Sequence, residues 1–291
     1  MFIIGNVFSQ KYVDVAKFYF GNSSQNKFEN SDSSTRIKEL GLEITIPIVI
    51  NPSDAILTGL VYERIQTRFF EKDPETTVSV IGLRAGLSKK HSDKWSGTYV
   101  LIPKLASDFD HIGSKDFQLG VIALLKYAKR TNKNYKLGIY YNSELFGPFI
   151  VPLFGIYYLS PDGKFETNLT LPFLADINYK LHPRLNIGLN FNGQVRSYHL
   201  TEVPSTDKPG YVVKATNELF SYLKFNLTKS LSIQTRLGYS VGRSFRAYDE
   251  NDKISFGSIL IKVGDDRQQL NTDFSDGFIY QAMLLFRVKT E

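Results

Sequence analysis

The segment from residue 231 to residue 248 reads LSIQTRLGYSVGRSFRAY, and it alternates apolar with polar residues along most of its length. One parity includes Leu231, Ile233, Leu237, Tyr239, Val241 and Phe245, and the other includes Ser232, Gln234, Arg236, Ser240 and Ser244. A period of two predicts a β-strand with one apolar and one wet face. Strands of soluble β-sandwiches usually have about 5 to 6 residues, so this run indicates a different architecture.

The same alternation recurs along the chain and is closed each time by a cluster of turn residues. Clear examples cover residues 40–48, 116–127 and 185–198. Short turns are expected at 51–54, 91–94, 130–134, 161–163, 182–183 and 228–230. Longer polar loops alternate with them, at 21–34, 70–75, 107–115, 200–210 and 248–276. Short turns on one rim and long loops on the other are typical of transmembrane β-barrels.

These features predict an all-β fold: a closed, up-and-down, antiparallel transmembrane β-barrel of 12 to 14 strands. Lipid offers no hydrogen-bond partners, so an open sheet edge cannot remain inside a bilayer and the wall must close. The pattern gives thirteen runs, and bacterial single-chain barrels have even strand numbers. Fourteen strands result if Pro172 splits 164–180 into a hairpin or if 254–263 is a strand. Twelve result if the first run lies outside the wall, and we favour fourteen.

Composition narrows the classes of function. The chain of 291 residues has no cysteine, which excludes disulfides, thiolate metal sites and cysteine nucleophiles. Its net charge of +6 is dispersed without a basic block, so we expect no nucleic-acid partner. Residues 1–10 are apolar and then small and polar, which suggests the remnant of a secretory signal peptide. We expect residues 11–291 to form a single barrel domain.

Three stretches carry a resemblance to a known group of proteins. They are Leu-Glu-Ile-Thr-Ile-Pro at 42–47, Leu-Pro-Phe at 171–173 and Ile-Asn-Tyr-Lys-Leu-His-Pro-Arg-Leu-Asn-Ile-Gly-Leu at 177–189. With these stretches the chain resembles an uncharacterised family of Gram-negative outer-membrane β-barrel proteins, over about residues 12 to 288. The resemblance implies the outer membrane of a Gram-negative bacterium as location. It also implies outer-membrane lipid and the barrel insertion machinery as partners, and it supplies no functional residues.

The polar parity of the strands defines the residues that we expect to line the lumen. These are Glu39, Glu43, Arg64, Arg68, Lys126, Lys136, Asp176, Asn190, Gln194, Arg196, Glu218, Lys224, Gln234 and Arg236. Inward charges of both signs can pair and plug a barrel, or they can line a water-filled path. Inward glycines, such as Gly188 and Gly238, either leave lumen space or admit a neighbouring long side chain.

Three functions therefore stay open. The first is a porin-like passive or selective path for small solutes through a polar lumen. The second is a plugged structural or interaction barrel whose long surface loops bind a partner. A remote third is an outer-membrane lipid hydrolase, because Ser197 and His199 share a parity near a strand end. The sequence offers no complete catalytic set and no complete metal-binding pattern, so we expect neither an enzyme nor a cofactor.

Overall fold

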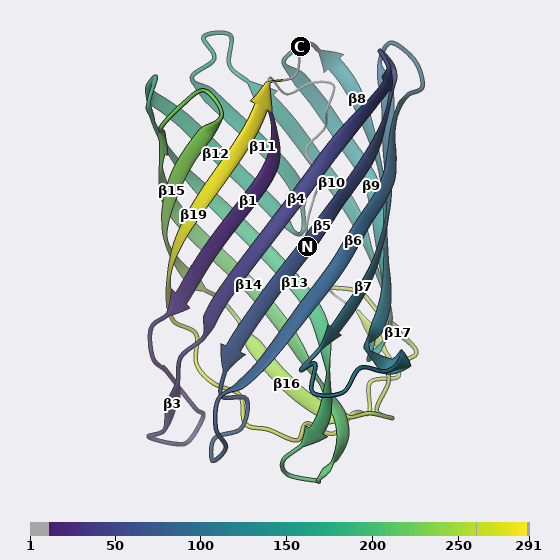
Figure 1. Ribbon diagram of the computed structural model, residues 1–291, viewed down its shortest axis with the longest axis vertical. Helices are drawn as coiled ribbons and strands as arrows, with labels where there is room; N and C mark the ends of the chain where they lie inside the picture. The colour runs from purple at the N-terminus through teal and green to yellow at the C-terminus, as the bar shows by residue number, and fades with distance from the viewer. Residues whose placement is uncertain (1–11, 260, 290–291) are drawn as a thin grey trace.

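The alternating runs form one wall of antiparallel strands that closes on itself (Figure 1). The computed structural model describes residues 12–259 and 261–289, and within these residues the barrel has 14 strands. In chain order these strands are β1 (Tyr12–Ser23), β4 (Lys38–Asn51), β5 (Asp54–Thr67), β6 (Thr76–Lys90), β7 (Trp95–Ser107), β8 (Phe117–Arg130), β9 (Lys133–Glu144), β10 (Gly147–Leu159), β11 (Phe165–Leu171), β12 (Leu174–His182), β13 (Leu185–Val203), β14 (Lys208–Asn226), β15 (Leu231–Ser240) and β19 (Phe278–Lys289). Pairing of β19 with β1 closes the ring. The expected signal-peptide remnant at residues 1–10 lies outside the described residues.

The count of fourteen is the one that we favoured, and Pro172 is the reason for it. Pro172 lies in the turn between β11 and β12, so the stretch 164–180 is a hairpin. The alternative extra strand at 254–263 is wrong, because that stretch forms only β17 (Phe256–Gly257) and β18 (Lys262–Val263). The long run at 231–248 is also divided. Its second part, β16 (Ser244–Asp249), pairs with β14 and not with β19.

The two rims differ as predicted, except that the long loop expected at 200–210 is wrong. It is a turn of residues 204–207, because β13 continues to Val203 and β14 begins at Lys208. The turns at 52–53, 91–94, 131–132, 160–164, 183–184 and 227–230 lie at the upper end of Figure 1, which we call the turn end. The longer connections lie at the lower end, which we call the loop end, and they include β2 (Asn26–Lys27), β3 (Ser34–Thr35) and the 3-10 helix η1 (Ser114–Asp116). Barrels of this type place short turns in the periplasm and long loops outside the cell.

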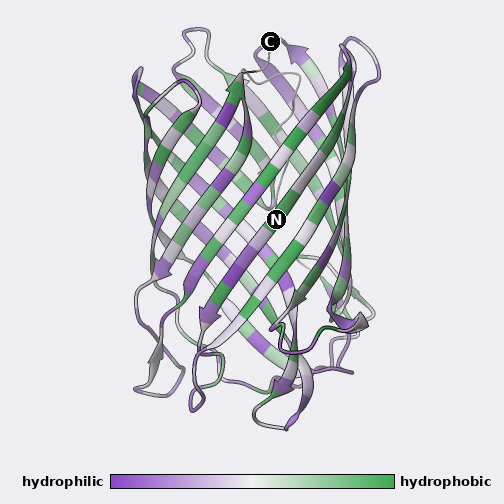
Figure 2. Ribbon diagram, in the orientation of Figure 1, coloured by the Kyte–Doolittle hydropathy of each residue, from purple (hydrophilic) through white to green (hydrophobic). Residues whose placement is uncertain are grey.

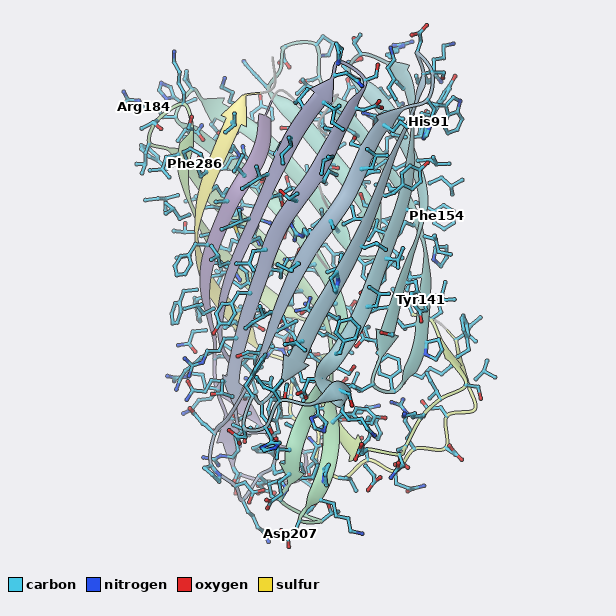
Figure 3. All side chains as sticks on the ribbon, turned by 45° about the vertical axis from the view of Figure 1, so that its right-hand side comes forward. His91, Tyr141, Phe154, Arg184, Asp207 and Phe286 are labelled. Carbon is cyan, nitrogen blue, oxygen red and sulfur yellow. The ribbon has the colours of Figure 1, made fainter. Side chains whose placement is uncertain are left out.

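Apolar and polar residues alternate in bands along the strands (Figure 2), and side-chain exposure shows that the outer face of the wall is apolar. On β15 the side chains of Leu237 and Tyr239 are 49% and 43% exposed, whereas Ser240 is fully buried. Figure 3 shows Tyr141, Phe154 and Phe286 at the outside of the wall. Such a belt of apolar and aromatic side chains suits lipid contact. Among the described residues, none of the helical segments is long and apolar enough to cross a bilayer.

The hairpin of β11 and β12 is short, and this changes the course of β13. These strands have 7 and 9 residues, whereas β13 and β14 have 19 each. Beyond Gly193, whose N–H donates to the carbonyl of Phe173, β13 has no wall neighbour on that side. It therefore leaves the wall and reaches β7, where His199 pairs with Ser107 in a parallel bridge. Residues 194–203, 208–217 and 244–249 together form a three-stranded segment that we call the inner sheet.

The inner sheet lies between two parts of the wall at the loop end. Three successive residues of β13, Arg196, Ser197 and Tyr198, are all buried, which a strand with one solvent-facing side does not allow. One apolar cluster packs on its first face and includes Ile65, Val78, Tyr198, Val212 and Phe245. A second cluster packs on its other face and includes Phe146, Phe149, Leu153, Tyr211 and Tyr248. The inner sheet therefore fills the mouth of the barrel.

Candidate functional site

The barrel interior is the candidate site, and most of the predicted lumen residues point into it. We assign a residue to the inner face when it, or a residue two positions away on the same strand, is buried. By this criterion the following predicted residues point inward: Glu39, Glu43, Lys126, Lys136, Asp176, Asn190, Gln194, Arg196, Glu218, Lys224, Gln234 and Arg236. Polar alternation thus identifies the inner face on most strands.

The prediction is wrong for Arg64 and Arg68. Arg64 is exposed on the outer face of β5, opposite Leu40 of β4, and Arg68 follows β5 in a loop, where its guanidinium donates to the carbonyl of Glu71. The inward residues of β5 are instead largely apolar and include Val61 and Ile65. These apolar residues of β5 face inward because the inner sheet, which fills the mouth of the barrel, offers them apolar partners. Arg64 therefore lies on the outer face of β5.

Glu63 lies on the same inward face of β5 as Val61 and Ile65, and its buried carboxylate joins the wall to the inner sheet. Its carboxylate accepts hydrogen bonds from Tyr198 Oη at 2.7 Å and from Tyr19 Oη at 3.2 Å. Arg196 and Lys214 of the inner sheet lie 3.1 Å and 3.8 Å from it. Lys214 also pairs with Glu39 of β4 at 2.7 Å. These contacts fix one position of the inner sheet against β4 and β5.

Another buried carboxylate, Glu144 at the end of β9, holds the opposite face. It accepts hydrogen bonds from the Ser197 N–H at 2.7 Å and from Ser197 Oγ at 2.6 Å. Lys104 of β7 lies 3.8 Å from the same carboxylate. Gln118 Nε2 donates to the Ser197 carbonyl at 3.0 Å, so side chains replace the missing strand neighbour of β13.

Sequence reasoning missed Glu63, Lys104 and Glu144 as interior groups. The sequence did contain an indication for two of them, because each is a charged residue flanked, two positions away on either side, by apolar residues. Glu63 stands between Val61 and Ile65, and Lys104 stands between Ile102 and Ala106. Burying a lone charge is unfavourable, so such a residue needs a partner across the fold. Glu144 carried no comparable signal, since its role depends on where β13 leaves the wall.

The interior has an apolar and a polar side. The apolar side is a cluster on β5 and β7–β10 that contains Leu57, Val100, Ile122, Leu124, Tyr140 and Leu153. The same strands also bury polar side chains beside this cluster, such as Lys126, Lys136 and Asn142. The polar side consists of inward residues of β11–β15, namely Asn168, Asp176, Asn178, Asn190, Lys224 and Arg236. Hydrogen bonds order this side, including Asn190 Nδ2 to Asp176 at 3.3 Å and Tyr222 Oη to Asp176 at 3.2 Å.

Two of the inward glycines, Gly188 and Gly238, admit neighbouring aromatic side chains and so do not widen the lumen. A Cβ atom at Gly188 would stand 2.3 Å from the ring of Tyr222, and one at Gly238 would stand 2.3 Å from the ring of Phe220. Between β5 and β9 a cavity lined by Val61, Ile102, Lys104, Tyr140 and Arg196 has about 20 Å³ of free space. That is room for about one water molecule. The described conformation is therefore closed at this level.

The long loop 250–277 is clamped over the edge of the inner sheet. Arg267 stacks on the ring of Tyr248 at 4.3 Å and on Phe146 at 5.4 Å. Asp265 binds its guanidinium through two hydrogen bonds of 2.7 Å and 2.9 Å. Hydrogen bonding from Arg267 lowers the pKa of Asp265 from 3.8 to about 2. The clamp therefore holds at neutral pH.

The contacts do not assemble a serine hydrolase from Ser197 and His199. Ser197 Oγ donates to Glu144, while His199 Nδ1 lies 2.8 Å from Asp116. Asp108 accepts hydrogen bonds from the backbone and hydroxyl of Thr201 at 2.6 Å and 3.0 Å, which makes it a structural group of the loop end. In the described part of the chain, no group of three or more His, Cys, Asp or Glu side chains has metal-binding geometry.

Comparison with known proteins places the chain in a family. Residues 5–265 match a domain of unknown function, DUF6268. The chain belongs to this family. A search of curated protein sequences gave no match to this DUF6268 member.

Solved structures similar to this DUF6268 protein are barrels of the outer membrane. The COG4313 outer membrane channel from Pseudomonas putida F1 is 6% identical, with a TM-score of 0.49, over 99% of this chain and 97% of that one. A FadL homologue from Pseudomonas aeruginosa is 11% identical, with a TM-score of 0.40, over 98% and 92% of the two chains. The NanC porin is 8% identical, with a TM-score of 0.37, over 94% and 100%. The closed antiparallel barrel of the DUF6268 chain itself follows from its own strand pairing.

Proposed function

We propose that this protein is a gated channel for small solutes in the outer membrane of a Gram-negative bacterium. The observation that supports this proposal is that the interior has an apolar and a polar side, each made of inward residues from several strands. A solute with an apolar body and a polar group would find a partner on each side. The proposed passage is therefore selective for amphipathic small molecules, and it is not a wide aqueous pore.

The gate in this proposal is the inner sheet. It fills the loop end, and polar contacts to Glu63 and Glu144 hold it on its two faces. These side-chain contacts can be exchanged for contacts with water or with a solute group. A wall strand, in contrast, cannot leave its place without breaking the backbone hydrogen bonds to its neighbours and so opening the barrel. Movement of the inner sheet away from β5 or β9 would join the loop end to the interior.

A reversible lock tests the proposal. His199 and Ser107 are directly paired between β13 and β7, and the chain has no cysteine of its own. The paired variant His199→Cys and Ser107→Cys is suited to a disulfide, because paired strand residues stand within the required Cα separation of about 4.4 to 6.8 Å. We expect oxidation to suppress benzoate flux into liposomes and a thiol reductant to restore it. Each single-cysteine variant serves as a matched control.

Flux that is unchanged by the oxidised lock would refute the inner sheet as the gate. If the reduced variant and the wild type both leave liposomes impermeable to benzoate and to larger and smaller solutes, the channel proposal fails. The plugged interaction barrel would then be the better description.

A further inference from the structure

Two lysines of the apolar side face each other directly across neighbouring strands. Lys126 of β8 and Lys136 of β9 are register partners, and both point inward. Their residues are 4% and 6% exposed. Like charges directly opposite each other on one face of a sheet are destabilising. A barrel can place such a pair in its interior when something else balances the charge.

No carboxylate of the described residues forms an ion pair with either lysine. Lys136 Nζ donates to Asn168 Oδ1 and Thr170 Oγ1, which are neutral acceptors, and Lys126 has no hydrogen bond or ion pair with a described residue. Three other interior lysines pair with acids, namely Lys17 with Glu43, Lys104 with Glu144, and Lys214 with Glu39. Lys224, on the polar side, has no ion pair with a described residue either, but no second lysine is its register partner. Glu166, the inward acid of nearby β11, pairs with neither Lys126 nor Lys136 within the described structure.

The surroundings of the lysine pair are apolar on the side toward the loop end. Leu124 precedes Lys126 by two residues on the same face of β8, and Val100 and Leu153 belong to the same cluster as Leu124. Next to Lys136 along β9 stands Gly138, which leaves no side chain above Leu124. A positive pair therefore borders an apolar surface along the long axis of the barrel.

We propose that Lys126 and Lys136 bind the carboxylate of a small organic acid in the open state of the barrel, when Leu124, Val100 and Leu153, which are covered in the described conformation, can receive its apolar body. This inference rests on the proposed channel function and names its substrate class. The two oxygens of one carboxylate can each accept a hydrogen bond from one ammonium group, and the anion lowers the charge of the pair from +2 to +1. Charge-assisted hydrogen bonds to an anion are the stronger kind. Asn168 and Thr170 hold Lys136 in place for this role.

Calorimetric titration of the full-length protein in detergent tests the site without any requirement for flux. The probes are benzoate, its neutral analogue benzamide, and inorganic phosphate. We expect benzoate to bind and benzamide not to bind. Lys126→Gln and Lys136→Gln should each weaken benzoate binding about tenfold, as the loss of one charged hydrogen bond implies. The matched control is Lys229→Gln, an exposed lysine in the turn between β14 and β15, which should leave the affinity unchanged.

Three results would overturn the site: no heat with benzoate, an unchanged affinity in the double variant Lys126→Gln and Lys136→Gln, or an equal loss of affinity in Lys229→Gln. Phosphate binding without benzoate binding would overturn the assignment to organic acids. A gel shift on heating verifies that each variant is a folded barrel before titration. Benzoate binding without flux would refute the channel and keep the site, whereas flux without binding would refute the site alone.

Discussion

Removing the charge of Glu63 should release the inner sheet. The Glu63 carboxylate is 2% exposed and lies 3.1 Å from Arg196 and 3.8 Å from Lys214. In Glu63→Gln, Arg196 loses this ion pair, while Lys214 keeps Glu39 at 2.7 Å. Breaking a buried ion pair on one side costs about 3 to 5 kcal/mol. If this cost falls on the attachment of the inner sheet, the ratio of open to closed states rises by about 10² to 5 × 10³.

The assay is the labelling rate of a cysteine placed at Val212, which is fully buried in the inner sheet. A water-soluble thiol reagent reaches this position only when the sheet moves, so we expect Glu63→Gln to accelerate labelling by about 10² or more. Neutralising Glu202, an exposed acid of the inner sheet, is the matched control and should have no effect. The double variant Glu63→Gln and Arg196→Gln should recover part of the closed state, because it removes both members of the ion pair and not one alone. An unchanged labelling rate, or loss of the heat-resistant barrel itself, would refute the reasoning.

Three further predictions test other parts of the fold. Leu237→Arg places a charge on the lipid face and should cost about 2 to 4 kcal/mol in urea unfolding from lipid vesicles, whereas Gln234→Arg on the inner face of β15 should cost less. Gly41→Ala puts a Cβ atom 2.2 Å from the ring of Tyr19, so it should lower the free energy of unfolding by about 1 to 3 kcal/mol, while Gly113→Ala, with no atom within 4 Å, should be neutral in the same measurement. The pKa of Asp265 is lowered from 3.8 to about 2, so its ion pair stabilises the loop clamp above about pH 4 and is lost as the pH falls through about 2. Because Asp265 is partly exposed to solvent, we expect the ion pair to contribute only about 1 kcal/mol. Hydrogen exchange of loop 250–277, corrected for the intrinsic effect of pH, should therefore accelerate between about pH 4 and pH 2 in the wild type and show no such step in Asp265→Asn.

Local periodicity was sufficient for the wall but not for the mouth. Alternation identified the faces of β4, β8, β9 and β15 because each of these strands has lipid on one side and the interior on the other. The same rule failed for Arg64, since the inward neighbours of β5 pack against an apolar inner sheet that no local pattern announces. The bend of β13 depends on the shortness of a hairpin that precedes it, and on acceptors as distant as Glu144. Such contacts join residues far apart in the chain, and a single sequence carries no record of them.

The interior lysine pair and the charged attachment of the inner sheet suggest that one kind of solute group acts on both. A carboxylate that reaches the inner sheet can replace Glu63 as the partner of Arg196 and Lys214, because it offers the same oxygen acceptors. A ligand shifts a conformational equilibrium only when it binds one state more tightly than the other. In the closed state Glu63 already occupies these cations, so an organic acid binds them better in the open state. We therefore expect saturating benzoate to accelerate labelling of the Val212→Cys variant and benzamide to leave the rate unchanged. The acceleration should persist in the double variant Lys126→Gln and Lys136→Gln, since the gate cations are separate from that pair. Equal rates with and without benzoate would mean that the inner sheet opens without regard to the charge of the solute.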